Sequence, residues 1–171
     1  MATKSIKLAL VDDHKLFRKG LISLVEMVCN DCTILFEADN GIDLQEKLVT
    51  ENQPDIILMD INMPHMDGFE SVKWLSEHFP LIKVLVVSMI EKEESIVRML
   101  KLGVKGYLGK DVEPKELGEA LRSIIQKNES TAQIAIKTLF SIHEHTGMFN
   151  IHNKLPGKIF CIFYSFNNGL I

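Results

Sequence analysis

The sequence lacks any long apolar run, any internal repeat and any excess of positive charge. No stretch approaches the roughly 20 apolar residues of a membrane span. The apolar stretch near the N-terminus stops at Asp12, which argues against a signal peptide. A net charge of −4 disfavours a chain-wide electrostatic footprint for nucleic acid. We therefore expect a cytoplasmic protein with no membrane partner.

What the sequence does contain is enough apolar residues for a sizeable core. Hydrophobic residues make up 46% and charged residues 25% of the 171 residues, so the composition is not that of a disordered chain. The length predicts one domain of ordinary size plus an extension.

Two of the three cysteines, Cys29 and Cys32, have the spacing of a redox motif. The pair follows a predicted helix and precedes a predicted strand. A reactive pair normally lies at a helix N-terminus, where the helix dipole favours the thiolate. We therefore predict two buried or half-buried thiols here rather than a redox site.

Strand and helix patterns alternate from residue 6 to about residue 127. The predicted strands are 6–11, 33–38, 55–59, 83–88 and 106–108, and helical periodicity covers 16–28, 44–48, 68–78, 91–102 and 114–125. This alternation predicts an α/β fold in which helices cover both faces of a five-stranded parallel sheet. Among doubly wound sheets we choose the flavodoxin-like strand order 2-1-3-4-5.

Acidic residues directly follow two of the apolar strands. Asp12 and Asp13 come after the first strand, and Asp60 comes after the third. In the chosen order these strands are neighbours, so the three carboxylates should converge at the sheet edge where such folds bind ligands. Two carboxylates about 4 Å apart repel by about 4 kcal/mol at an effective dielectric constant near 20. The cluster should therefore recruit a cation, and oxygen ligands suit Mg²⁺.

Two further residues fall at the same edge of the predicted sheet. Ser88 ends the fourth strand, and Lys110 lies just beyond the fifth. A divalent cation beside a carboxylate makes that carboxylate a workable phosphoryl acceptor. A hydroxyl and an ammonium group could then bind the remaining phosphoryl oxygens.

Together these residues resemble the receiver domain of two-component response regulators. The stretches 10–21 (LVDDHKLFRKGL), 58–64 (LMDINMP) and 106–111 (GYLGKD) resemble the NarL/LuxR-type subfamily in particular. The resemblance covers roughly residues 6–127, which places a receiver domain at residues 1–128.

The resemblance implies a role for each site residue. Asp60 would accept a phosphoryl group from a histidine kinase in a phosphorelay. Mg²⁺ would be bound by Asp13, Asp60 and the backbone carbonyl of Asn62, with Asp12 acting through water. The phosphoryl group would be bound by Ser88 and Lys110, and the switch would consist of Ser88 and Tyr107. The family also implies a homodimer through the face formed by the fourth and fifth helices.

Three positions depart from the family pattern, and one is Asp111, which follows Lys110 where other receivers commonly have proline. Gly109 stands where a larger apolar residue is usual, and its backbone freedom could loosen Lys110. Met89 follows Ser88 where a small residue is frequent, and it could narrow access to the phosphoryl site.

Residues 129–171 differ in character from the rest. NarL/LuxR-type regulators carry a C-terminal helix-turn-helix that binds DNA, but this segment has three basic residues and no recognisable helix-turn-helix. We hypothesise a truncated or altered regulator whose DNA-binding output domain is absent. The segment also contains His143, Glu144, His145 and His152, but without a cysteine at zinc-site spacing we expect no metal site there.

Three other functions were weighed against the receiver. A phosphatase of the haloacid dehalogenase type would need an aspartate where Asn62 stands. A flavodoxin would need a phosphate loop where Asp12 and Asp13 would repel phosphate. A receiver-like interaction module that works without phosphorylation would have lost its acids or its lysine, and this chain keeps them. We expect a phosphorylation-driven switch of transcription, not an enzyme that turns over a substrate.

Overall fold

The computed structural model describes residues 5–89 and 92–125 of the chain. The predicted extension at 129–171 lies outside these residues. The described part contains five strands and five helices in strict alternation. They are β1 (Ile6–Val11), α1 (Lys15–Val28), β2 (Cys32–Ala38), α2 (Gly41–Lys47), β3 (Ile56–Met59), α3 (Gly68–His78), β4 (Lys83–Ser88), α4 (Glu93–Lys101), β5 (Gly106–Gly109) and α5 (Pro114–Ile125).

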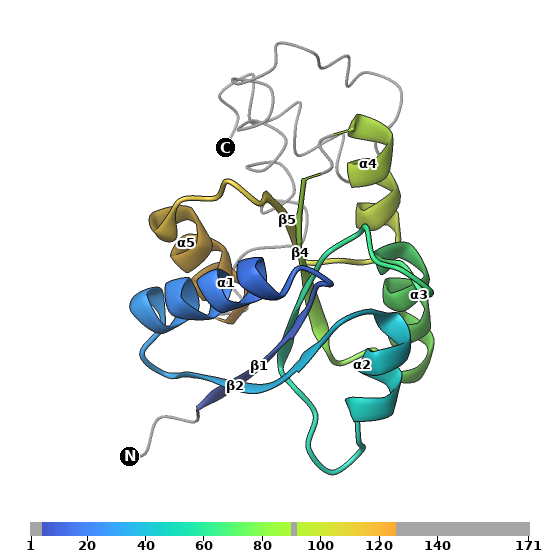
Figure 1. The fold of residues 1–171 in the computed structure, drawn as a ribbon, viewed down its shortest axis with the longest axis horizontal. Helices are drawn as coiled ribbons and strands as arrows, with labels where there is room; N and C mark the ends of the chain where they lie inside the picture. Colours follow the sequence, from blue (N-terminus) through green and yellow to red (C-terminus); the bar gives the residue numbers. More distant parts are fainter. Residues whose placement is uncertain (1–4, 90–91, 126–171) are drawn as a thin grey trace, which may run out of the picture.

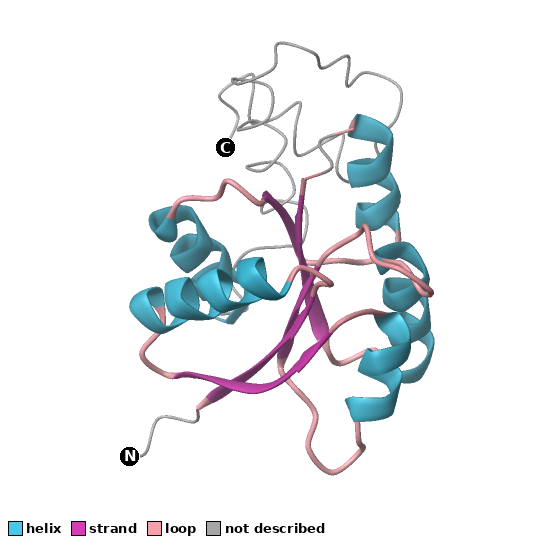
Figure 2. Cartoon of the chain, viewed as in Figure 1, coloured by secondary structure: helices cyan, strands magenta, loops and turns pink. Residues whose placement is uncertain are grey.

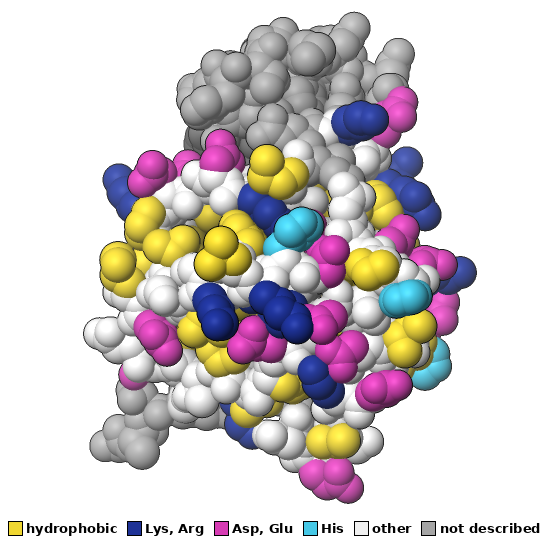
Figure 3. Space-filling view, viewed as in Figure 1, with side chains coloured by type: hydrophobic (Ala, Val, Ile, Leu, Met, Phe, Trp, Pro, Cys, Tyr) yellow, Lys and Arg dark blue, Asp and Glu magenta, His cyan; other side chains and the backbone are white. Residues whose placement is uncertain are grey.

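The strands form one parallel sheet in the order β2-β1-β3-β4-β5, which confirms the predicted doubly wound topology. Helices α1 and α5 lie together on one face of the sheet, and α2, α3 and α4 lie on the other (Figures 1 and 2). None of the described helices is long and apolar enough to cross a membrane. On the face drawn in Figure 3, basic and acidic side chains are interspersed.

Both faces of the sheet are buried, so alternate strand residues enter two separate cores. Ala9 and Ile57 pack beneath α2, α3 and α4, whereas their neighbours Leu8 and Ile56 pack beneath α1 and α5. This double burial explains why the strands are continuous apolar runs rather than alternating patterns. Because both faces are buried, charged residues lie at or near the ends of the central strands rather than in their middle, and the candidate site lies at these ends.

The prediction for Cys29 and Cys32 was wrong in one respect. Their positions are as expected, since Cys29 follows α1 directly and Cys32 begins β2. The two side chains are joined in a disulfide, however, rather than remaining free thiols. The turn that brings β2 back beside β1 holds their Cα atoms 5.4 Å apart, which is within the usual range for a disulfide.

His65, in the loop between β3 and α3, has the backbone conformation that glycine adopts most easily. Its φ is +68°, and its side chain is exposed. A left-handed conformation costs an L-residue about 1–2 kcal/mol, and glycine avoids this cost. Part of the gain in stability is lost again, because glycine loses more conformational entropy on folding than other residues do. We expect His65→Gly to raise the free energy of unfolding by about 0.5–1 kcal/mol in urea denaturation. His65→Ala serves as the control, and a gain in that variant as well would contradict the explanation.

Candidate functional site

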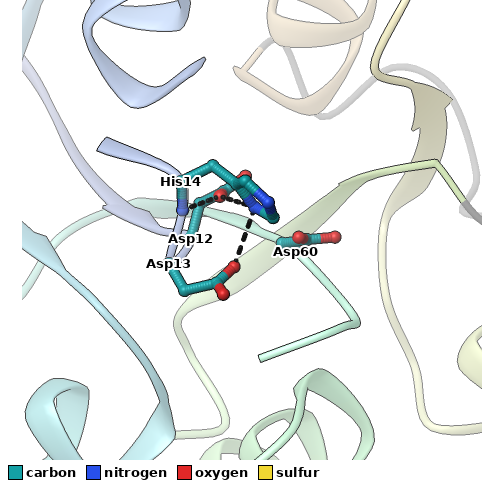
Figure 4. Close-up of side chains that lie close together, drawn as sticks. All are labelled: Asp12, Asp13, His14 and Asp60. Atoms are coloured by element: carbon teal, nitrogen blue, oxygen red, sulfur yellow. Dashed lines mark hydrogen bonds and ion pairs between the residues drawn. The ribbon is translucent and has the colours of Figure 1, made fainter. Parts of the chain in front are cut away.

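Four side chains with metal-binding atoms lie together at the C-terminal edge of the sheet. Asp12 and Asp13 follow β1, and Asp60 follows β3, the neighbour of β1. One donor atom from each of Asp12, Asp13, His14 and Asp60 lies within 4.8 Å of the others (Figure 4). Asp12 and Asp60 are each only 3% exposed, so their charges are poorly screened by water. The structure thus brings the three predicted acids together.

Lys110, directly after β5, reaches into this acidic cluster. Its Nζ lies 2.6 Å from Asp12 Oδ2 and 2.7 Å from Asp60 Oδ2. Burial, the largest single influence, lowers the pKa of Lys110, but hydrogen bonds to Asp12 and Asp60 and their charges together raise it above its ordinary value of 10.5. The ammonium group is therefore charged at neutral pH and neutralises part of the cluster.

The remaining predicted residues lie at or near the same edge of the sheet. Ser88 ends β4 and Tyr107 lies in β5, and both are fully buried. The backbone N–H of Lys110 donates to the carbonyl of Ser88 at 3.2 Å, which joins the ends of these two strands. Asn62 is exposed, two residues beyond Asp60.

The departures from the family pattern at Gly109 and Met89 do not disturb this arrangement. Gly109 pairs with Ser88 as the last residue of β5, so its backbone is held in the sheet. Next to it, Lys110 is held through its side chain as well, because its Nζ lies 4.6 Å from the centroid of the Phe17 ring and is paired with two acids. The side chain of Met89 is 74% exposed and thus lies largely in solvent.

Arg18 is a site residue that the sequence analysis did not identify. This residue of α1 is 6% exposed, and its guanidinium donates to the backbone carbonyl of Asp12. It also pairs with Glu37 at 2.8 Å and with Asp39 at 2.7 Å. Burial alone lowers the pKa of Arg18, but these two carboxylates outweigh it and raise the pKa. Arg18 therefore ties the turn that carries the acids to the end of β2.

His14 takes up the position just before α1, as a capping residue would, but its side chain makes no capping hydrogen bond. Its backbone N–H donates to Asp12 Oδ1 at 2.7 Å. The ring turns toward the acids, with Nδ1 2.9 Å from Asp13 Oδ1 and 3.4 Å from Asp12 Oδ1 (Figure 4). The sequence by itself does not indicate that the ring points toward the acids.

The residues present fit a hard divalent cation. Three carboxylates supply the oxygen ligands that Mg²⁺ prefers. In addition, Oδ1 of Asp13 is buried and accepts no hydrogen bond from the part of the chain that the structure describes. A buried carboxylate oxygen without a donor is costly, and a bound cation would remove that cost.

Comparison with known proteins agrees with this geometry. Residues 8–122 match the response regulator receiver domain family. The chain is 43% identical over 115 residues to the nitrate/nitrite response regulator protein NarL of Escherichia coli, covering 66% of this chain and 51% of that protein. It is 36% identical over 121 residues to the transcriptional regulatory protein DegU of Brevibacillus brevis, covering 71% and 50%. The chain thus spans about half the length of these relatives.

Solved structures give the same result. The signal receiver domain of a response regulator from Mycobacterium tuberculosis has a TM-score of 0.66 and 26% identity, covering 74% of this chain and 100% of that one. A DNA-binding response regulator of the LuxR family from Staphylococcus aureus has a TM-score of 0.64 and 25% identity, covering 70% and 98%. The chain therefore belongs to the response regulator receiver domain family, and its receiver is of the NarL/LuxR type.

Proposed function

We propose that Asp60 accepts a phosphoryl group from the phosphohistidine of a sensor histidine kinase. The supporting observation is the placement of the Lys110 ammonium group between two buried carboxylates, of which Asp60 is one. A carboxylate oxygen of Asp60 attacks phosphorus and forms an acyl phosphate. The P–N bond of the phosphohistidine breaks, and the electron pair and a proton end on the departing imidazole. Lys110 and Ser88 then bind the phosphoryl oxygens.

Mg²⁺ is the proposed cofactor of this transfer. When bound, it neutralises charge that develops on the transferred phosphoryl group. Asp13, Asp60 and the backbone carbonyl of Asn62 would hold it, and Asp12 would act through water. Arg18 keeps this turn in place through the Asp12 carbonyl.

The proposed consequence of phosphorylation is a change of surface rather than turnover of a substrate. The added charge and acceptor oxygens pull Ser88 and Lys110 toward the phosphoryl group. Tyr107 follows Ser88, since β4 and β5 are adjacent. The surface formed by α4, β5 and α5 then changes shape, and we propose that a second copy of the chain binds there.

The proposed output is transcription control through a DNA-binding domain, as the names of the relatives indicate for those proteins. The proposed receiver spans residues 1–128. The segment 129–171 lies outside the described residues, so the hypothesis of a missing output domain remains a prediction from the sequence.

The test is the intact mass of the full chain after incubation with Mg²⁺ and acetyl phosphate. We expect a single phosphoryl adduct on the wild type and none on Asp60→Asn, because an amide cannot form the acyl phosphate. Asp55→Asn is the matched control, since Asp55 precedes β3 at the opposite end of the same strand, and it should still be phosphorylated. An adduct that persists in Asp60→Asn would refute the proposal. No adduct on a folded wild type would favour an interaction module that works without phosphorylation.

A further inference from the structure

We propose that His14 is an additional metal ligand of the acidic cluster, and that it raises the affinity of the site for divalent cations that bind imidazole, such as Mn²⁺ and Co²⁺, relative to its affinity for Mg²⁺. The inference rests on the proposed function because it concerns the same acids. It adds a nitrogen donor to what would otherwise be an oxygen site.

The first observation is the spacing of the donor atoms. Nδ1 of His14 lies 2.9 Å from Asp13 Oδ1 and 3.4 Å from Asp12 Oδ1. Adjacent ligands of an octahedral ion with bonds of about 2.1 Å lie about 3.0 Å apart. The imidazole nitrogen and the Asp13 oxygen are thus spaced as neighbouring ligands of a single ion would be.

The second observation is the contact between the His14 ring and Asp13, which is an ion pair when the ring is protonated. The buried Oδ1 of Asp13 accepts no hydrogen bond from the described part of the chain, although Nδ1 of His14 is its close neighbour. A cation bound by both atoms would attract the carboxylate oxygen and the lone pair of the imidazole nitrogen alike. His14 and Asp13 are therefore arranged to share an ion.

The third observation is that the backbone of His14 is held beside the acids while its ring stays accessible to solvent. The His14 N–H donates to Asp12 Oδ1, which closes the turn, and the next residues begin α1. The side chain of His14 is 67% exposed, so water and ions reach it. Lys110 approaches the Oδ2 atoms of Asp12 and Asp60, whereas His14 faces Oδ1 of Asp12 and Asp13. The two groups therefore do not compete for the same oxygens.

The chemical consequence is a choice between metals. Mg²⁺ favours oxygen ligands and keeps several waters, so an imidazole adds little to its binding. Imidazole suits the transition metals, whose affinity for nitrogen and oxygen sites rises from Mn²⁺ through Co²⁺. The ratio of Mn²⁺ to Mg²⁺ affinity is therefore the quantity that His14 should control.

The experiment uses Mn²⁺ as the probe on the full chain. Electron spin-echo spectroscopy detects the ¹⁴N nucleus of an imidazole bound to Mn²⁺. Titration of free Mn²⁺ by electron paramagnetic resonance, with Mg²⁺ as competitor, gives both affinities. We expect the ¹⁴N signal in the wild type and its loss in His14→Ala. In that variant the Mn²⁺ affinity should fall about tenfold, whereas the Mg²⁺ affinity should stay within about twofold.

The matched control is His78→Ala, which removes an exposed histidine at the end of α3 and should keep the ¹⁴N signal. A wild type without the signal, or a signal that survives His14→Ala, would overturn the inference. Asp60→Asn separates the two proposals. If it weakens Mn²⁺ binding while no ¹⁴N signal is seen, only the role of His14 is wrong. If it leaves Mn²⁺ binding unchanged, the acidic cluster is not the metal site, and both proposals fail.

Discussion

Lys110→Ala should lower the free energy of unfolding by about 3–5 kcal/mol in the absence of divalent metal. The side chain of Lys110 is 8% exposed, and its ammonium group pairs with the side chains of Asp12 and Asp60, which are 5% and 3% exposed. Removing the lysine leaves the negative charges of the two buried carboxylates without a positive partner, and such unpaired buried charge lowers the stability of the folded state strongly. Urea denaturation in the presence of a chelator measures the loss. Lys115→Ala, which removes an exposed lysine of α5, should change stability by less than about 0.5 kcal/mol.

The metal dependence of the Lys110→Ala variant distinguishes this explanation from simple loss of packing, and its pH dependence follows from the pKa of Lys110. Because the pKa of Lys110 is raised, its stabilising effect is fully present below 10.5 and is lost only as the pH rises through the higher folded-state value. The gap between wild type and variant should thus stay constant between about pH 7 and pH 9. Mg²⁺ should stabilise the variant more than the wild type, because it replaces the missing cation.

We further expect the variant to bind Mg²⁺ while its surface no longer responds to phosphorylation. A Lys110→Ala protein as stable as the wild type in chelator would contradict the assigned role of the lysine.

Gly68→Ala should lower the free energy of unfolding by about 3 kcal/mol, the upper end of the cost of overpacking. Gly68 begins α3, and a Cβ there would lie 2.3 Å from the carbonyl oxygen of Asp60 and 2.7 Å from the Cα of Ile61. These atoms belong to backbone, which cannot move aside as a flexible side chain can. The backbone N–H of Gly68 also donates to the Ile61 carbonyl at 2.9 Å, so the helix start and the strand end are fixed to each other.

The same substitution should affect the proposed chemistry, because the displaced backbone carries Asp60, the proposed phosphoacceptor. We expect phosphorylation by acetyl phosphate to be at least tenfold slower in folded Gly68→Ala, which a time course of intact mass would measure. Gly20→Ala is the matched control. A Cβ at Gly20, inside α1, would meet no atom within 4 Å, so alanine should add about 0.5–1 kcal/mol of stability there. If Gly68→Ala and Gly20→Ala changed the free energy of unfolding and the phosphorylation rate equally, the close approach of Gly68 to the Asp60 backbone would not explain the effect.

Much of the fold was predictable because the evidence for it is local. Four elements, 6–11, 68–78, 83–88 and 114–125, have the bounds predicted from periodicity. The apolar strands and the amphipathic helices between them indicate a parallel sheet covered on both faces, since no other architecture buries both patterns. Deviations occur at element ends, where β2 begins one residue early at Cys32 and β3 one residue late at Ile56.

The sequence by itself thus determined the order of the elements, the apolar core and the strand ends that carry Asp12, Asp13, Asp60, Ser88 and Lys110. Only the tertiary structure decided how those ends are held. Arg18 pairs with Glu37 of β2 and with Asp39 in the loop after it. Gly68 has no Cβ and so lets α3 lie close to the backbone of Asp60. The ring of His14 turns toward the acids. The physical reason is distance along the chain. Periodicity is a property of neighbouring residues, whereas the contacts of Arg18 and Gly68 depend on how separate segments pack against one another. The direction of the His14 ring depends on the turn after β1, which periodicity does not describe.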